Sequence, residues 1–522
     1  MKPNNNNIAD NEIIDRIKNI RDDLFQRSNE EIFKAIHELD LKYAGESFYN
    51  TNINGILINL GMDKKSIALI SIAIKRLTSL HDDNPSDKYL FDIGNGFLSI
   101  ADIKSGNKSE ISFLIKDAIY RKARGYLNRV ADRRNLPSAA TNFGNILEKY
   151  GRYYEAILLY DKAIKSNRNF GMALGNKAIA LIFYYRIALK KNLDILFEAS
   201  ELLRRALDSN NTLEIGGQNA IDSFNLHLAS LNNFLTNKKR RHPSSRIERT
   251  SYQAFCSSRN IYLNFCFNCY KCETGYKDTF FPPFIEKIKH ASDQERLKYH
   301  SFSKKMYYSV KTLNQILEDY ATARSIRFHA AFDNFNDLDA DTEYASVLDY
   351  CKNSMSYGYS KAAYLKLFNI LDKIAHLAFY NYEVEQKDIY FKDLLGPAFQ
   401  DLVIKTNNRG LLALHNLARD FEYDEIYGHL RIIRHYLTHD LVDIKIDMFS
   451  EANKNMELFE DHYLTEGLLT DYLDELFQIV KAALLYFGQA LKKDYDGATK
   501  NGTNPMLPLT ILKQKEIFEG FD

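Results

Sequence analysis

Residues 141–182, TNFGNILEKYGRYYEAILLYDKAIKSNRNFGMALGNKAIALI, hold the clearest structural pattern in the chain. Gly151 separates two amphipathic segments within this stretch. Small and aromatic residues alternate along it, at Gly144, Tyr153, Ala156, Tyr160 and Ala163. Small side chains let two antiparallel helices approach closely, and aromatic rings fill the groove beside them. The stretch therefore predicts a helical hairpin.

The pattern recurs at a fixed interval, since 34 residues separate Asn142 from Asn176 and Gly144 from Ala178. The second helix of this copy is delayed, and its small and apolar positions are Ala199, Leu203 and Ala206. An earlier, weaker copy includes Asn95 and Gly96. The pattern resembles a tetratricopeptide (TPR) repeat, and such repeats need about three units to bury their faces. We predict a TPR-like α-helical repeat domain over 11–236; the alternative is an irregular helical bundle without a binding groove.

Length and composition limit the classes of protein that the chain can belong to. At 522 residues it is too long for one ordinary core, and two or three domains are expected. Only 9 Pro and 23 Gly occur, which favours an all-α protein. The 69 Lys and Arg nearly balance the 68 Asp and Glu, so binding of nucleic acid would require a local basic patch.

The ends of the chain and its cysteines point to a cytoplasmic protein. Residues 1–10 and 501–522 are expected to be tails, and residues 1–10 lack the apolar stretch of a signal peptide. No run of about 18 apolar residues occurs, so no membrane association is expected. Five cysteines, an odd number in a long chain, argue against a disulfide framework.

A basic stretch, NKKRRHPSSRIERT at 237–250, is predicted to be the linker between two domains, since Pro243 and two serines disfavour a helix there. Its cations could contact RNA phosphates. The candidate RNA-binding residues are Lys238, Lys239, Arg240, Arg241, Arg246 and Arg249, with Arg431 further along the chain. The alternative is a solvated linker with no ligand.

Helices are expected again over 251–500. The strongest amphipathic segments are 302–324, 359–382, 424–446 and 463–490. In the second of these, one apolar stripe is typical of a core face: Leu367, Phe368, Leu371, Ile374, Ala375 and Ala378. Four such helices predict an up-and-down bundle.

The candidate catalytic residues lie in the segment YGHLRIIRHYLTHDLVDIKID, which runs from Tyr427 to Asp447. Arg434 is followed by His435, three further residues and His439, a pattern that resembles the motif of HEPN ribonucleases. That family usually has Asn where His435 stands. An acidic residue in a preceding long helix, Asp372 in NILDKIAHLAF, also matches the family layout.

The resemblance implies a HEPN-type helical bundle with metal-independent endoribonuclease activity and no cofactor. It also implies products with 2′,3′-cyclic phosphate and 5′-hydroxyl ends, and a setting in antiphage defence or a toxin system. An imidazole can exchange a proton near neutral pH, and a guanidinium matches the geometry of a phosphate. His439 would therefore act as base or acid and Arg434 would stabilise the phosphate, while His435 would position groups and Asp372 would orient Arg434.

A spacing of five residues turns two side chains about 140° apart on an ideal helix. Arg434 and His439 are therefore not expected to form a compact site alone, and HEPN domains pair to bring their motifs together. We accordingly expect a homodimer through the C-terminal bundle, with a possible protein partner on the repeat region. The alternative is a non-catalytic scaffold that binds a protein or a nucleotide, with Arg434 and His439 buried as a structural pair.

Two groups of residues are alternative candidates for a metal site. His435 and His439 share a helix face and Asp440 follows them, but no third ligand is evident. Weak candidates for a structural metal are Cys266, Cys269 and Cys272, with Cys256 or a histidine as the fourth ligand. Simple thiols are the alternative, because two separated CxxC pairs are lacking. Nucleotide-binding glycine loops and the GxSxG motif of serine hydrolases are absent from the sequence.

Overall fold

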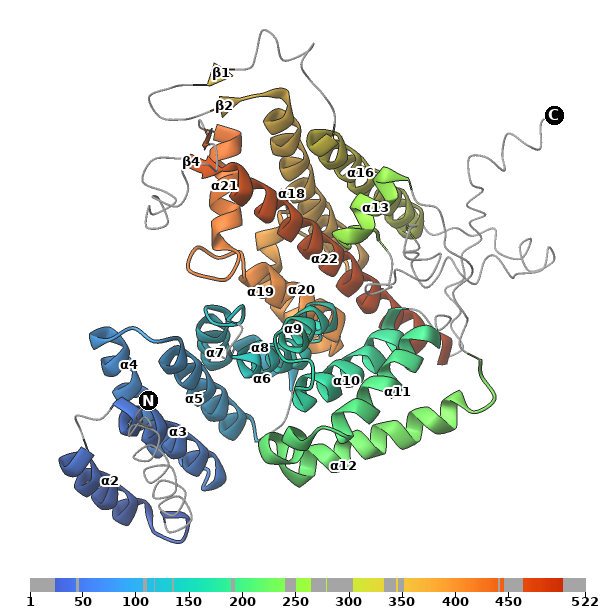
Figure 1. The fold of residues 1–522 in the computed structure, drawn as a ribbon. Coiled ribbons are helices and arrows are strands. Elements are labelled where there is room, and N and C mark those ends of the chain that lie inside the picture. Colours follow the sequence, from blue (N-terminus) through green and yellow to red (C-terminus); the bar gives the residue numbers. More distant parts are fainter. Residues whose placement is uncertain are drawn as a thin grey trace, which may run out of the picture. The chain divides into compact units, whose positions relative to one another are not determined.

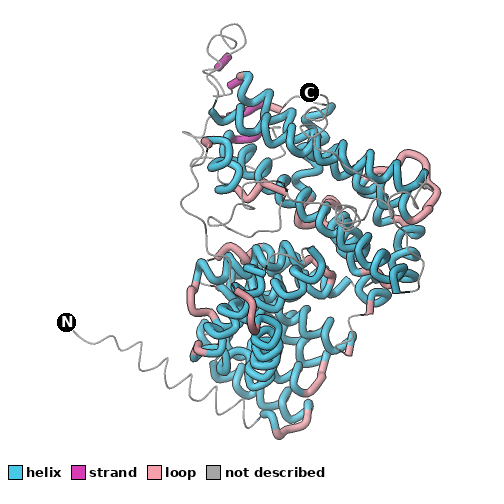
Figure 2. The backbone as a smooth tube through the Cα atoms, turned by 90° about the vertical axis from the view of Figure 1, so that its right-hand side faces the viewer, coloured by secondary structure: helices cyan, strands magenta, loops and turns pink. Residues whose placement is uncertain are grey.

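The structure is a computed structural model, and α-helices dominate it (Figures 1 and 2). The residues it describes are 24–43, 47–106, 110–116, 118–133, 136–188, 193–239, 250–263, 278, 304–332, 344–345, 352–439, 442–445 and 463–500. They form two compact units, one within 1–181 and 198–236 and the other within 182–197 and 237–522. The prediction of an all-α protein is confirmed. The tails expected at 1–10 and 501–522 lie outside the described residues.

The first unit is built from successive helices. They are α2 (Asn29–Tyr43), α3 (Ser47–Asp63), α4 (Ile67–Asp83), α5 (Asp87–Ser105), α6 (Ile111–Lys116), α7 (Ala118–Asn128), α8 (Pro137–Lys149), α9 (Tyr153–Ser166), α10 (Gly171–Ala188), α11 (Leu193–Leu207) and α12 (Asn210–Leu235). Helices α10 and α11 each contribute residues to both units. None of the described helices has the length and apolar character needed to cross a membrane.

Helices α8 and α9 form the hairpin predicted from residues 141–182. Gly151 turns the chain between them with a φ of 81°, a left-handed conformation that glycine adopts without strain. Gly144 faces the ring of Tyr160, and an added Cβ there would lie 2.6 Å from Cε1 of that ring. The absence of a side chain at Gly144 therefore sets how closely the two helices approach.

Asparagine pairs join helices α5, α8 and α10. The Asn142 side chain, on α8, donates to Asn95 Oδ1 on α5 at 2.7 Å. Asn176 Nδ2, on α10, donates to Asn145 Oδ1 on α8 at 2.8 Å. Helices α5, α8 and α10 are thus linked in series by polar contacts between partly buried side chains.

The second unit contains three long helices and several shorter elements. They are α13 (Ser251–Ser258), α16 (Lys304–Phe332), β1 (Tyr344–Ala345), β2 (Lys352–Asn353), α18 (Met355–Asn381), η2 (Phe391–Leu395), α19 (Pro397–Thr406), α20 (Arg409–Arg419), α21 (Gly428–His439), β3 (Asp443–Lys445), β4 (Tyr463–Thr465) and α22 (Glu466–Lys500). Helix α18 packs against both α16 and α22, and α20 packs against α22 (Figure 1). The stripe predicted to be core on α18 is buried throughout.

The third amphipathic segment is shorter than predicted. A helix was expected to extend to residue 446, but α21 ends at His439 and the chain continues into β3. Strand β3 pairs in parallel with β4, and this pairing buries Ile444 and Leu464. The apolar residues after His439 therefore serve a short sheet instead of another helical turn.

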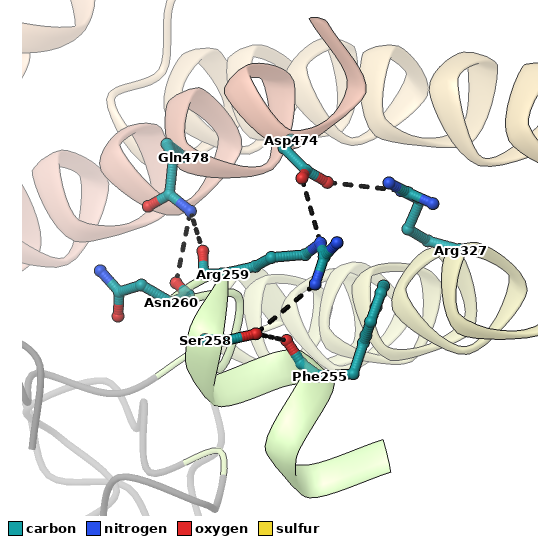
Figure 3. A network of polar contacts seen from close by, with 7 residues as sticks. All are labelled: Phe255, Ser258, Arg259, Asn260, Arg327, Asp474 and Gln478. Atoms are coloured by element: carbon teal, nitrogen blue, oxygen red, sulfur yellow. Dashed lines mark hydrogen bonds and ion pairs between the residues drawn. The ribbon is translucent and has the colours of Figure 1, made fainter. Parts of the chain in front are cut away.

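A polar network holds α13 to the long helices, as Figure 3 shows. Asp474 on α22 accepts from Arg259 Nε at 3.1 Å and from Arg327 Nε on α16 at 3.3 Å. Gln478 donates to the carbonyl oxygen of Arg259 at 2.7 Å. The end of α13 is therefore attached to both α16 and α22.

The contact between α20 and α22 gives a first prediction. A Cβ on Gly410 would lie 2.4 Å from the Ala490 nitrogen and 2.6 Å from the Tyr486 oxygen, and backbone atoms cannot move aside cheaply. We expect Gly410→Ala to lower the free energy of unfolding of the second unit by about 1–3 kcal/mol. The control is Gly358→Ala on α18, where nothing lies within 4 Å of the added Cβ. That variant should gain up to about 1 kcal/mol from helix propensity, and calorimetry would compare the two.

His415 gives a prediction about pH. This side chain on α20 is 2% exposed, and burial, assisted by the nearby charge of Arg419, lowers its pKa to about 3. The unfolded chain binds the proton below about pH 6.5, whereas the folded chain resists it. The contribution of neutral His415 to the free energy of unfolding is fully present above about pH 6.5. It should be lost as the pH falls toward 3, by up to about 1.4 kcal/mol per pH unit. Urea unfolding of wild type and His415→Leu should show a shallower pH dependence in the variant; an equal dependence would contradict the assignment.

Candidate functional site

Helix α21, which carries the candidate motif, is held on α18. The buried Tyr364 hydroxyl of α18 donates to the Leu430 carbonyl oxygen of α21 at 2.8 Å. Burial keeps the pKa of this hydroxyl well above its usual range, so the group remains a donor. The backbone of α21 is thereby set against α18 one turn before Arg434.

The carboxylate of Asp372 joins α18 to two other segments. Its Oδ2 accepts from Arg434 Nη2 at 2.8 Å, in the contact that the sequence predicted. Its Oδ1 accepts from the backbone N–H of Phe391, at the start of η2, at 2.9 Å. The Asp372 side chain is 19% exposed and that of Arg434 is 33% exposed, so the pair is partly shielded from water.

These three segments surround a pocket of about 440 Å³. Its lining residues come from α18, from the η2 segment, from α21 and, with Phe421, from the turn after α20: Leu365, Phe368, Asn369, Leu371, Asp372, Tyr390, Phe391, Lys392, Phe421, Arg431, Arg434, His435, Thr438 and His439. The size is within the range of sites that bind small ligands. Four predicted residues (Arg434, His435, His439 and Asp372) and the predicted cation Arg431 are thus brought together.

Positive charge dominates the lining. Three cationic side chains line the pocket, those of Arg431, Arg434 and Lys392, together with one carboxylate, that of Asp372. The Arg434 guanidinium carbon lies 5.2 Å from the centroid of the Phe368 ring. This cation–π contact holds the guanidinium group in addition to its ion pair with Asp372. The guanidinium gives one nitrogen to Asp372, and within the described part of the chain its other nitrogens make no hydrogen bond. They are available to an anion in the pocket.

The two histidines of the motif lie side by side on α21. Their ring centroids are 5.1 Å apart, and both residues are exposed. Although Arg434 and His439 point in different directions on an ideal helix, both line this one pocket. The long Arg side chain accounts for the difference, because its guanidinium reaches well beyond the helix surface.

A partly buried hydrogen bond also holds the chain just beyond the motif. Lys361 Nζ on α18 donates to the Val442 carbonyl oxygen at 2.9 Å. Burial lowers the pKa of Lys361, and the charge of Asp443 opposes that shift. Val442, directly before β3, is therefore attached to the same helix that carries Asp372.

Two other predicted RNA-binding residues, Lys238 and Lys239, do not line this pocket. Lys238 and Lys239 are exposed, while Arg240 and Arg241 lie outside the described residues, as do Cys266, Cys269 and Cys272. Cys256 is buried in α13, and burial raises the pKa of its thiol to about 11. Over the described residues, no group of three His, Cys, Asp or Glu is placed to hold a metal ion.

Outside helix α21, the polar lining residues that were missed from the sequence are Asn369, Tyr390 and Lys392. Asn369 precedes Asp372 by one helical turn, so the helical spacing could have found it. Tyr390 and Lys392 lie at the start of η2, distant in sequence from Arg434. An aromatic residue next to a lysine in IYFKD is a signal for nucleic-acid contact, but nothing local connects it to the motif.

Comparison with known families is consistent with this geometry. Residues 300–494 match the family model described as LA2681-like HEPN, and this match supports a C-terminal HEPN domain. The matched range includes α18, η2 and α21, and therefore the whole pocket. Helix α13 precedes the range but is attached to two helices within it. No curated protein and no solved structure matched the chain.

The two contacts of Asp372 can be separated by substitution. Asp372→Asn loses the charge that pairs with Arg434 but keeps an oxygen for the Phe391 N–H, and should cost less than about 1 kcal/mol. Asp372→Ala removes both the charge and the acceptor oxygen. It should lower the free energy of unfolding by about 1–3 kcal/mol more than Asp372→Asn does, because a partly buried N–H loses its acceptor. Hydrogen–deuterium exchange should show fast exchange of the Phe391 amide in the Ala variant alone. Equal protection in the two variants would contradict the role given to Oδ1.

Proposed function

We propose that the C-terminal domain is a metal-independent endoribonuclease of HEPN type, with Arg434 and His439 as its catalytic residues. The observation that carries the proposal is that both side chains line one pocket with an excess of positive charge. RNA is the ligand that this pairing suits, because cleavage within the RNA chain needs a proton acceptor and a cation beside one phosphate. The family match over 300–494 supports the same class of protein.

The proposed reaction uses the ribose itself as the nucleophile. The 2′-oxygen forms a bond to the adjacent phosphorus, and the bond from phosphorus to the 5′-oxygen of the next nucleotide breaks. His439 either accepts the proton of the 2′-hydroxyl or donates a proton to the 5′-oxygen, and water carries out the other transfer. Arg434 stabilises the charge on the phosphate. The products are a 2′,3′-cyclic phosphate and a 5′-hydroxyl.

Two neighbours of the pair take positioning roles in this proposal. Asp372 holds one edge of the Arg434 guanidinium by the 2.8 Å ion pair and leaves the remaining donors for the phosphate. His435 lies against His439 with ring centroids 5.1 Å apart and limits the orientations of that ring. The two histidines could also contact the same phosphate group.

The first unit is proposed to regulate or target the nuclease as a TPR-like repeat region that binds a protein partner. Its support is the serial linkage of α5, α8 and α10 by asparagine pairs, which is the arrangement of stacked hairpins. The basic residues of 237–250 would add contacts to RNA. Pairing of two chains through the HEPN domain, and a role in antiphage defence or a toxin system, belong to the same proposal and rest on the family resemblance.

One observation favours a second candidate, a non-catalytic scaffold that binds a protein or nucleotide. The ion pair between Arg434 and Asp372 is also the contact by which a purely structural arginine would hold α21 to α18. The two candidates differ in what the pocket does with RNA. A nuclease must stop cleaving RNA when His439 is removed, whereas a scaffold does not cleave RNA at all.

Cleavage of RNA in the presence of EDTA tests the proposal. Wild type should cut single-stranded RNA and leave cyclic-phosphate ends. Arg434→Ala and His439→Ala should each reduce the rate by about 10²–10⁴-fold, since each removes a group needed at the reacting phosphate. A 2′-deoxy substitution at the scissile nucleotide should block cleavage there.

The matched control is His376→Ala, because His376 is exposed on α18 and does not line the pocket. This variant should cut at the wild-type rate. Circular dichroism should show that all variants remain folded. Cleavage that survives in both pocket variants would exclude the assigned residues, and no cleavage by folded wild type would favour the scaffold.

A further inference from the structure

The start of η2 offers a contact surface beside the catalytic pair. Tyr390 is 48% exposed and lines the same pocket as Arg434 and His439. Its backbone is fixed, since its N–H donates to Asp393 Oδ2 at 2.6 Å and its carbonyl oxygen accepts from the Asp393 N–H at 2.9 Å. A half-exposed aromatic ring on a fixed backbone leaves a face on which a base can stack.

A cation and an amide stand next to this ring. Lys392 Nζ lies 5.6 Å from the centroid of the Tyr390 ring, and among the described residues this is its only recorded interaction. Asn369 lines the pocket from α18, three residues before Asp372. Ring, cation and amide are the groups that stack on a base, contact a phosphate and hydrogen-bond to a base edge.

We propose that Tyr390, Lys392 and Asn369 form a nucleotide-binding subsite that selects single-stranded RNA. This inference rests on the proposed function, because it assigns RNA as the ligand of the pocket. One base stacks on the Tyr390 ring, Lys392 contacts the neighbouring phosphate, and the Asn369 amide contacts the edge of the base. Bases in a duplex are already stacked and paired, so a duplex cannot place one on Tyr390.

The attachment of η2 to Asp372 connects the subsite to the catalytic pair. The carboxylate that orients Arg434 also accepts from the Phe391 N–H, between Tyr390 and Lys392. The position of the bound nucleotide is thus tied to that of the guanidinium. Stacking on Tyr390 would thereby bring a phosphate of the same strand toward Arg434.

Binding of a short 2′-O-methyl RNA, which cannot be cleaved, tests the subsite independently of catalysis. Fluorescence anisotropy should show that wild type binds the single strand more tightly than the duplex. Tyr390→Ala should weaken binding of the single strand by roughly 5- to 150-fold, the value of one lost stacking contact, while Tyr390→Phe should bind as wild type does. Lys392→Ala should reduce the slope of log affinity against log salt by about 0.7, the value for one lost phosphate contact.

The control is Lys387→Ala, an exposed lysine of the preceding loop that does not line the pocket, which should leave that slope unchanged. Equal affinity for single strand and duplex, unaltered binding by Tyr390→Ala, or no binding at all would overturn the subsite. Binding without cleavage of ordinary RNA would contradict the nuclease and leave the subsite supported. Cleavage of ordinary RNA by wild type, together with unaltered binding by Tyr390→Ala, would support the nuclease and contradict the subsite.

Discussion

The two hydrogen bonds of the Asp372 carboxylate are the contacts on which the site depends. One oxygen accepts from Arg434 on α21, and the other from the backbone of Phe391 at η2. Three segments that are far apart in sequence meet at this one side chain. A partly exposed ion pair adds little net stability, because water still screens it. The value of Asp372 therefore lies in placing the guanidinium and the η2 backbone relative to each other.

That carboxylate can place other groups because its own helix is held by packing on neighbouring helices. Helix α18 packs against both α16 and α22, and its core stripe is buried (Figure 1). The Tyr364 hydroxyl and the Lys361 ammonium of the same helix hold the backbone before and after the motif. A site whose groups are fixed before the ligand arrives loses less entropy on binding, which favours both affinity and reaction.

The sequence predicted what depends on local pattern and missed what depends on packing. Helical spacing gave the buried stripe of α18, and the motif with its acidic partner gave the pair of Arg434 with Asp372. Helix α20 was not singled out as a core element, because Gly410, His415 and Asn416 are buried together with its apolar residues, and their burial follows from tertiary packing. The η2 residues were missed because only the tertiary contact of Asp372 with Phe391 brings them to the motif.

The pocket also changes the argument for pairing of two chains. On an ideal helix Arg434 and His439 diverge, which suggested that a second copy must complete the site. Both side chains line the pocket of a single chain, together with two further cations, Arg431 and Lys392. A second copy would therefore bring a second pocket instead of a missing half. Pairing would then extend the positively charged surface along an RNA strand, so that its contribution would be to substrate length and affinity.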